Sequence, residues 1–511
     1  MKSKLVHSRP GLNQIGVFPT TALYFVAVGF SGLAVAIVWL GGHSMLVLLA
    51  PLLLLLTVIS IARPAIGVAA VVGFAFVTVS KLPTLAEFGE LSVRFLDIGF
   101  GLLILVILIR IVATRRMPYS RELPDLFVPL LPFLLYVGAS LILVYLSTPQ
   151  HWASSSASYL RLVQTAFMVP LVYLSLEKPS DVKLLVRILI TFGVLSVGFA
   201  LVESWSAQAD ASALQLGAGR YGGLLGPNSL GLVSGMLLIY ALISRSKASF
   251  PLTTFLTLAG LAGLILSKSA MATLAAAGTV GLYLVAQSIR KITFREIGRI
   301  GVVAALLLLG AGVTISVLRP GDAGGLLDFR EGSFAQRLMI AYAGLRIFLE
   351  TPILGVGWQI SGIRDVIGDP QLNMLLRQQF PSLPQHYFLD ILPTSLHNMY
   401  IQILAELGAV GFALFTYAVV QIGKSIVRIV GTIEANSDLR TKGLFYAFSL
   451  LYLLLWWNSN ALFGGQTESI LAFTFLGAIA AIGRISRRIS QESIDGTSTL
   501  LQPDSAHEPA G

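Results

Sequence analysis

The stretch SLHNMYIQILAELGAVGFALF, residues 395–415, decides the fold. Most of its side chains are apolar, and its length is what a helix needs to cross a bilayer. Two titratable groups nevertheless belong to it: His397 stands at its start, and the carboxylate of Glu406 lies inside it. A membrane helix with this pattern raises the question of what these two side chains do, and the rest of the chain provides the setting for an answer.

The composition of the whole chain is that of an integral membrane protein. Hydrophobic residues make up 55% of the 511 residues and charged residues only 12%, whereas soluble domains carry about 25% charged residues. Apolar runs of ~17–25 residues, each long enough for a membrane helix, recur along the sequence. The sequence contains no cysteine, which excludes disulfides, thiolate catalysis and cysteine-based zinc sites. We therefore predict an all-α, polytopic membrane helix bundle.

We expect about fourteen membrane spans, within a range of 12–14. The chain then divides into eleven spans within residues 1–318, a long loop at 319–397 with amphipathic helices, three spans within 398–488, and a tail at 489–511. The polar composition of this tail indicates disorder. The expected spans are 18–40, 44–61, 64–80, 96–113, 124–147, 158–175, 183–203, 228–244, 250–267, 269–287, 299–318, 398–423, 442–463 and 466–484.

The basic residues indicate the orientation of the bundle. With the N-terminus inside, roughly two-thirds of the 35 lysines and arginines fall in cytoplasmic connections, as the positive-inside rule requires. Both termini are then cytoplasmic, and the connections at 204–227 and 319–397 are external. Because topology explains the net charge of +10, that charge does not indicate a nucleic-acid partner.

The basic residues of the two external connections are all arginines. The planar guanidinium group suits phosphate, because it offers several donors in a fixed fork. Ordinary salt bridging within the loops is the alternative for any one of them. The long loop holds Arg319, Arg330, Arg337, Arg346, Arg364 and Arg377, and the shorter one holds Arg220.

Arg220 lies in the glycine-rich stretch LGAGRYGGLLGPNSLG, residues 216–231. The formal match to a dinucleotide-binding fingerprint carries no weight, because a membrane span precedes it and no βαβ unit surrounds it. The glycines instead allow the backbone to approach a ligand closely. Pro227 suits the first position of a helix. A helix N-terminus beside an arginine is a candidate anion site.

Arg337 opens a helix that we expect to run from about residue 334 to 349 and to stop before Pro352. Ser333 and Gln336 have the spacing of a capping box. A cation in the first turn of a helix opposes the helix dipole, which favours a role for Arg337 in binding a ligand.

For His397, Ser395 or Thr394 is the expected helix cap, which would leave the imidazole in the first turn. The helix dipole there disfavours the charged form, so we expect a lowered pKa and an imidazole able to accept a proton. A loop histidine bonded to the backbone is the alternative. Glu406 follows nine residues later, on a different face of a regular helix, and we expect it to find a partner within the bundle.

The remaining polar residues give weaker indications. The six histidines are scattered without metal-ligand spacing. Asp97, Arg161 and Glu203 lie in or at the ends of expected spans, where they suit either the relay of a transporter or structural pairing.

Four elements in order resemble the O-antigen ligase and O-antigen polymerase family. GRYGGLLGPNSLG resembles its early arginine and Pro-Asn element, and LSKSAMATLAAAGTVGL is similar to its next helix start, with Lys268 where arginine is usual. RLMIAYAGLRIFLETPILGVGW resembles its arginine-to-glycine element. The resemblance covers about residues 200–420, and the first 200 residues match only as hydrophobic spans. In the last element, which the opening stretch resembles, the matching residues are His397, Asn398, Leu404, Glu406, Gly408 and Gly411.

The resemblance implies a membrane glycosyltransferase that takes a glycan from an undecaprenyl-pyrophosphate donor on the outer face of the bacterial inner membrane. It implies that His397 acts as general base, and that Arg220 and Arg337 bind and stabilise the pyrophosphate. It places Asn228, Asn398 and Lys268 among the substrate-binding residues and Glu406, Gly408 and Gly411 among the structural ones. It implies no metal and no cofactor.

The implied partners are the lipid-linked glycan, an acceptor that is a glycan or lipid A–core, and the bilayer. Ligation, polymerisation and transfer to protein stay open, with a preference for a polymerase because the long loop could hold a growing chain. A lipid-linked oligosaccharide flippase or a proton-coupled transporter is the alternative class. Transporters concentrate polar groups near mid-membrane, whereas the informative residues here gather in the two external connections.

Overall fold

The computed structural model describes the greater part of the chain from residue 56 onwards. Expected spans at 18–40 and 299–318, most of the span at 44–61, and Arg220 lie outside the described residues. The described residues are 56–76, 84–88, 91–114, 121–205, 221–245, 247–288, 333–362, 364–381, 383, 385, 388–390, 396–434, 437–459 and 466–500.

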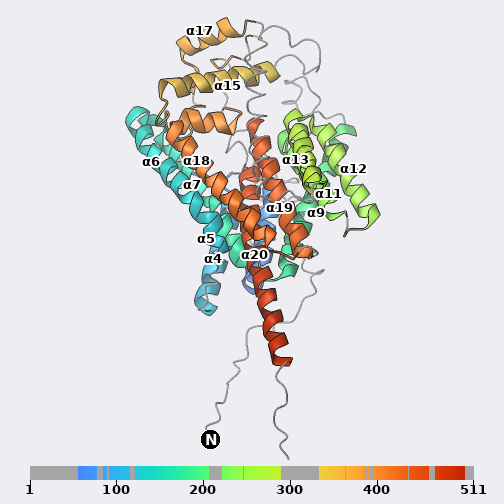
Figure 1. Ribbon diagram of the computed structural model, residues 1–511. Coiled ribbons are helices and arrows are strands. Elements are labelled where there is room, and N and C mark those ends of the chain that lie inside the picture. The colour runs from blue at the N-terminus through green and yellow to red at the C-terminus, as the bar shows by residue number, and fades with distance from the viewer. Residues whose placement is uncertain are drawn as a thin grey trace, which may run out of the picture.

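The described part of the chain is a helix bundle of the expected class (Figure 1). In this part, eight helical segments are long and apolar enough to cross a membrane. They are Glu122–Ser147, Pro149–Ser175, Pro179–Trp205, Pro227–Ser244, Phe250–Ser267, Ala270–Gln287, Met399–Gly431 and Thr467–Glu492. Each coincides with an expected span, which confirms a multi-pass membrane protein.

Three further helices also coincide with expected spans: α3 (Pro64–Ala75), α4 (Phe95–Thr114) and α19 (Asp438–Trp456). The other elements of the bundle are α5 (Glu122–Phe127), η4 (Val128–Leu130), α6 (Leu131–Ser147), η5 (Pro149–His151), α7 (Trp152–Ala166), α8 (Met168–Ser175), α9 (Pro179–Trp205), α11 (Pro227–Ser244), α12 (Phe250–Ser267), α13 (Ala270–Ser288), α18 (Met399–Gly431), η7 (Trp457–Ser459) and α20 (Gln466–Leu500).

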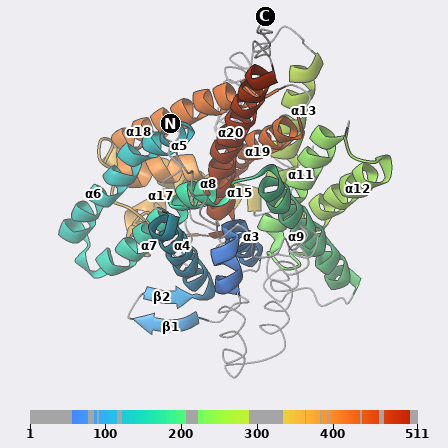
Figure 2. The same ribbon diagram turned by 90° about the horizontal axis from the view of Figure 1, so that it is seen from below.

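A small antiparallel hairpin departs from the purely helical expectation. Strands β1 (Thr84–Phe88) and β2 (Leu91–Arg94) pair in the connection between α3 and α4, with Phe88 opposite Leu91. Figure 2 shows the hairpin at the edge of the bundle, next to α4. The two strands are too short to have stood out from an ordinary connection in the sequence.

Helix α20 forms the centre of the bundle and continues beyond it. Its apolar half is almost completely buried, from Ile470 to Ile482, and it packs against α8 and α19. Figure 2 shows α18 and α19 on either side of it. The helix extends to Leu500, so the boundary expected at 489 for a disordered tail lies within a helix. The segment from Arg484 to Glu492 is mostly polar, and a helix that leaves the bilayer can expose such side chains to water.

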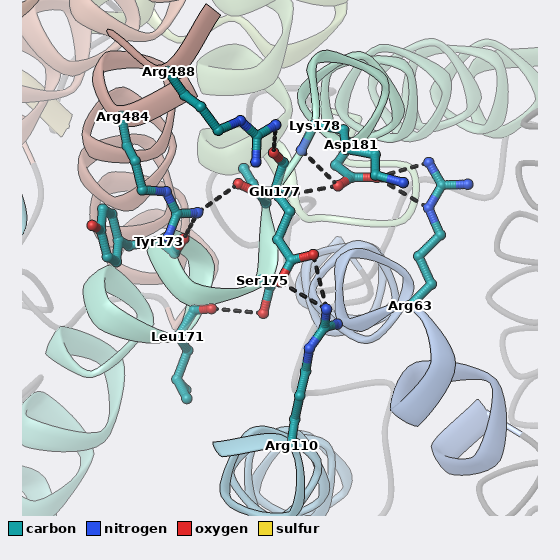
Figure 3. A network of polar contacts seen from close by, with 11 residues as sticks. Arg63, Arg110, Leu171, Tyr173, Ser175, Glu177, Lys178, Asp181, Arg484 and Arg488 are labelled. Atoms are coloured by element: carbon teal, nitrogen blue, oxygen red, sulfur yellow. Dashed lines mark hydrogen bonds and ion pairs between the residues drawn. The ribbon is translucent and has the colours of Figure 1, made fainter. Parts of the chain in front are cut away.

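Four arginines from three parts of the bundle hold the connection between α8 and α9 (Figure 3). Arg63, just before α3, donates to Asp181 Oδ1 at 2.7 Å, and Arg110 of α4 donates to Glu177 at 2.8 Å. Arg484 donates to the carbonyl oxygens of Tyr173 and Leu176, and Arg488 donates to the carbonyl oxygen of Glu177. Through the α8–α9 connection, these contacts join the early helices α3 and α4 to the last helix, α20.

A cap of described residues between Ser333 and Leu396 lies over one end of the bundle, which we call the cap end (Figure 1). It contains α15 (Ser333–Glu350), α16 (Arg364–Ile367) and α17 (Pro370–Gln379). The expected helix at 334–349 is therefore confirmed. Its own small core, around Met339, Ile340 and Leu376, continues into α18 through Ile401. The cap is thus packed onto the bundle by apolar contacts rather than attached as a separate domain.

Candidate active site

The first turn of α18 is capped by Asn398. Its Oδ1 accepts hydrogen bonds from the N–H groups of Tyr400 at 3.0 Å and Ile401 at 3.1 Å. Its Nδ2 donates to the carbonyl oxygen of Asn458, in η7, at 3.0 Å. The expected cap at Ser395 or Thr394 was wrong, because the asparagine three residues later performs that function and the helix starts at Met399. The cap amide thereby fixes the entry of α18 against the end of α19.

His397 consequently lies just outside the helix, next to the cap residue rather than in the first turn. The side chain keeps access to solvent. Loss of hydration among the surrounding protein atoms, and then the positive charge of Arg337, lower the pKa of His397 below its usual value. The expected direction of the shift is confirmed, but its causes differ from the expected effect of the helix dipole. The imidazole is therefore neutral, and able to accept a proton, over a wider pH range than an ordinary histidine.

Arg337 reaches this place because α15 crosses over the start of α18. The two helices approach so closely at Gly344 that a Cβ there would stand 2.5 Å from Ile401 Cγ2. Met339 and Ile340, on the buried face of α15, fix the rotation of the helix about its axis. Two residues that are sixty positions apart in sequence thus act on each other electrostatically at the cap end.

Helix α18 is broken at Gly408, which has φ 64° and ψ −166°. This combination is available essentially to glycine alone. A Cβ on Gly408 would stand 2.2 Å from the carbonyl oxygen of Ile353. The segment that follows α15 therefore passes directly against the break. Figure 1 shows the short part of α18 beneath α15 and the longer part descending through the bundle.

Backbone hydrogen bonds join this segment to both sides of the break. On one side, Val356 N–H donates to Ala405 O at 3.0 Å and Gly357 N–H donates to Glu406 O at 2.8 Å. On the other side, Ala409 N–H donates to Pro352 O at 2.8 Å. These bonds satisfy backbone groups that the break would otherwise leave unpaired inside the protein.

The carboxylate of Glu406 completes the same junction and is 1% exposed. It accepts from Ser361 Oγ at 2.5 Å, from Gln359 N–H at 3.0 Å and from Gln402 Nε2 at 3.2 Å. Gln359 has φ 62°, an uncommon value for a residue with a side chain. Gln402 belongs to α18, whereas Gln359 and Ser361 belong to the segment that passes the break. Glu406 therefore joins α18 to this segment.

Two more glycines are required by close approach at the junction. A Cβ on Gly355 would stand 2.3 Å from the carbonyl carbon of Glu406, and one on Gly411 would stand 3.2 Å from Tyr136 Cε1. Tyr136, on α6, also donates from its hydroxyl to Leu407 O at 3.2 Å. Gly355 belongs to the motif that follows α15, and Gly408 belongs to the motif of α18. Both glycines are needed because these two motifs contact each other.

A second group of predicted residues surrounds the start of α11. Pro227 is its first residue, as expected. The preceding glycine turn is held by Glu203, whose Oε2 accepts from Gly222 N–H at 3.0 Å and Gly223 N–H at 2.8 Å. Gly223 has φ 56°, and a Cβ there would stand 2.3 Å from Ser196 O. Glu203, whose role was open between relay and structural pairing, thus binds backbone amides of the turn.

Lys268 lies in the tight turn between α12 and α13. It adopts the left-handed conformation, with φ 46°, and ends α12. The turn packs against α11 at Gly231, where a Cβ would stand 3.0 Å from Ser267 Oγ and 3.0 Å from Ser269 Cβ. Lys268 is therefore a neighbour in the fold of the first turns of α11, where Asn228 lies.

The end of α19 connects the two groups of predicted residues. Tyr452 donates from its hydroxyl to Gly231 O of α11 at 3.0 Å, and Tyr400 of α18 donates to Leu454 O at 2.7 Å. Together with the bond from Asn398 to Asn458, these contacts place the starts of α11 and α18 on the same stretch of α19. The described candidate residues therefore form two groups, at the starts of α11 and α18, and α19 contacts both.

Among the described residues, no group of three or more histidine, cysteine, aspartate or glutamate side chains could hold a metal ion. The sequence did not identify Ser361, Gln359 or Asn458 as part of the site. Nothing about these residue types was distinctive, because their contacts arise only when the segment after α15 meets α18.

A sequence profile of the O-antigen ligase family matches residues 255–416. The matched segment includes Lys268, Arg337 and His397, together with the junction at Gly408. It confirms the resemblance drawn from the motifs, and it supports a membrane-embedded, glycan-processing enzyme of the O-antigen ligase or polymerase type. No curated protein sequence matched the chain.

Proposed function

We propose that this protein transfers a glycan from an undecaprenyl-pyrophosphate donor to an acceptor sugar on the external face of the inner membrane. The observation that carries the proposal is the proximity of Arg337 to His397 at the cap end: burial, and then the charge of this arginine, lower the pKa of the imidazole. A base for a hydroxyl group and a cation for a leaving phosphate are the two groups that such a transfer requires.

In the proposed reaction, His397 accepts the proton of the acceptor hydroxyl. The hydroxyl oxygen attacks the anomeric carbon of the donor sugar and forms the new glycosidic bond. The bond from that carbon to the pyrophosphate breaks, and its electron pair leaves with undecaprenyl pyrophosphate. Arg337, Arg220 and Lys268 bind the departing pyrophosphate, since charge-assisted hydrogen bonds to phosphate strengthen as negative charge develops. The proton on His397 then passes to solvent.

We assign Asn228 and Asn398 to the substrate-facing starts of α11 and α18, and Glu406, Gly408 and Gly411 to holding α18 in its broken form. The contacts of Glu406 with Ser361 and Gln359 support the structural assignment, because they occupy both carboxylate oxygens. The acceptor belongs to a growing polysaccharide, which we favour, or to lipid A–core. The lipid-linked product that accumulates in a strain lacking this protein distinguishes these acceptors.

The proposal is tested with purified protein and the lipid-linked glycan extracted from that deletion strain. Wild-type protein should release undecaprenyl pyrophosphate and lengthen or transfer the glycan, and Arg337→Ala should reduce both strongly. Arg377→Ala is the matched control, since Arg377 lies in the same cap but pairs with Asp390 at 2.8 Å and stacks on Phe388. Uptake of the intact lipid-linked glycan across a vesicle membrane, without release of pyrophosphate, would instead identify a transporter.

A further inference from the structure

Glu468 is a buried acid at the cap end to which the proposed reaction gives no role. It lies in the first turn of α20 and is 4% exposed. Its Oε1 accepts a hydrogen bond from Ser229 Oγ at 2.5 Å. Its Oε2 is buried and has no hydrogen-bond partner among the residues that the structure describes. Within the described part of the chain, Oε1 is therefore hydrogen-bonded and Oε2 is not.

The bound half connects Glu468 to the region proposed for the pyrophosphate. Ser229 is the third residue of α11 and directly follows Asn228. The glycine turn directly precedes α11 and is hydrogen-bonded to its first turn. The same part of α11 contacts the turn of Lys268 at Gly231. Through its hydrogen bond to Ser229, the Glu468 carboxylate is thus held beside the start of α11, which we propose faces the substrate.

A half-satisfied carboxylate is unfavourable for the stability of a helix bundle. Removing a carboxylate from water without supplying hydrogen bonds to both oxygens is costly, particularly inside a membrane protein. Glutamine would keep an oxygen for Ser229 and lower that cost. Because residues that reduce stability in this way concentrate at functional sites, the position of Glu468 indicates a ligand.

We propose that Glu468 binds a hydroxyl group of the first sugar of the lipid-linked donor. This inference rests on the proposed function, and it adds a residue that determines which sugar is accepted. The sugar that is attached to the pyrophosphate must lie beside the groups that bind the pyrophosphate. A sugar hydroxyl donates a hydrogen bond, and a carboxylate oxygen is a strong acceptor for it. In the ligand-free protein Oε2 is enclosed, so the sugar reaches it by displacing protein atoms that cover it.

The experiment compares two ligands with the full-length protein in detergent: undecaprenyl pyrophosphate without a sugar, and the glycosylated lipid extracted from a deletion strain. Glu468→Gln should bind the sugar-free lipid as tightly as wild type. It should bind the glycosylated lipid at least about tenfold more weakly, which is the order of one lost hydrogen bond to a charged group. Its melting temperature should stay the same or rise, because a partly unpaired buried charge has been removed.

Glu122→Gln is the matched control for this substitution. Glu122 is also a buried glutamate with one oxygen in an ion pair, to Arg487 in the second half of α20, and with Oε2 unpartnered among the described residues. It belongs to the other end of the bundle, so Glu122→Gln should leave the affinity for both lipids unchanged. A loss of glycosylated-lipid affinity in both variants would assign the effect to the buried charge in general and overturn the proposal.

Two other results would also overturn it. Equal affinity of Glu468→Gln and wild type for the glycosylated lipid would show that Oε2 meets no sugar. A lowered melting temperature with equal weakening for both lipids would show that Glu468 only supports the fold. Wild-type protein that binds neither lipid would refute the proposed function itself, which keeps the two failures distinguishable.

Discussion

Gly408 and Ile353 approach so closely that no side chain fits between them: a Cβ on Gly408 would stand 2.2 Å from Ile353 O. The contact lies where the segment after α15 crosses the break in α18. The segment continues from α15, which carries Arg337, and α18 begins directly after His397 and Asn398. The contact therefore helps to fix Arg337 relative to His397.

Gly408→Ala should therefore be strongly destabilising. The backbone conformation alone costs a non-glycine residue about 1–3 kcal/mol, and the steric clash with Ile353 adds to this. We expect a lower melting temperature in detergent and loss of activity together. Gly423→Ala is the control in the same helix, because nothing lies within 4 Å of a Cβ there, and it should be neutral or slightly stabilising. Equal melting temperatures for the two variants would contradict the broken-helix geometry.

Arg337→Lys should be nearly as damaging to turnover as Arg337→Ala. A lysine keeps the charge but cannot offer the fixed fork of donors that binds two phosphate oxygens at once. Release of undecaprenyl pyrophosphate from the lipid-linked donor is the measurement. Arg377→Lys, in the same cap, should retain most of the activity. Full activity in Arg337→Lys would show that only the positive charge at this position matters and would contradict binding through two phosphate oxygens.

His397→Ala should reduce turnover by about 10²–10⁴-fold, the usual contribution of a general base. Binding of the pyrophosphate lipid should persist, because the arginines remain. Thermal stability should change little, because the side chain lies outside the helix and keeps access to solvent. Near wild-type turnover in this variant would contradict the mechanism.

The pH dependence of wild-type turnover should follow the lowered pKa of His397. Only the neutral imidazole accepts a proton, so activity should fall as the pH drops through this pKa, at a more acidic pH than an unperturbed histidine near 6.5 would give. Substituting Arg337 by alanine removes a charge that lowers this pKa, so the acidic limb of any residual activity should move to higher pH. An acidic limb above the usual histidine range would contradict the shift.

The orientation of the bundle can be tested on this cysteine-free chain. Gln378 of α17 and Ser490 of α20 are both exposed. Helix α17 and the C-terminal part of α20 lie at opposite ends of the described structure (Figure 1). Gln378→Cys should react with a membrane-impermeant maleimide in intact cells, and Ser490→Cys should react only after the cells are opened. The reverse pattern would place the cap in the cytoplasm and remove the proposed site from the external face.

The sequence was sufficient to predict the membrane helices, because apolar length and charge placement carry that information directly. It also predicted the helix of Arg337 and the helix start at Pro227, since both depend on local capping and proline geometry. The cap at Asn398 was missed because three neighbouring residues can all cap a helix, and its bond to Asn458 selects one of them. The partners of Glu406 could not be foreseen, because Ser361 approaches it only through tertiary packing.

The backbone bonds across the break in α18 also determine how this protein can be divided. Pro352 and Val356 bond to opposite sides of the break, so the cap and α18 form a single structural module despite appearing in sequence as a loop followed by a span. A chimera that takes only the cap from a related enzyme would lose complementarity at this seam. Swapping specificity between relatives should therefore succeed when the exchanged piece includes both the cap and the first half of α18, and fail when it ends between them.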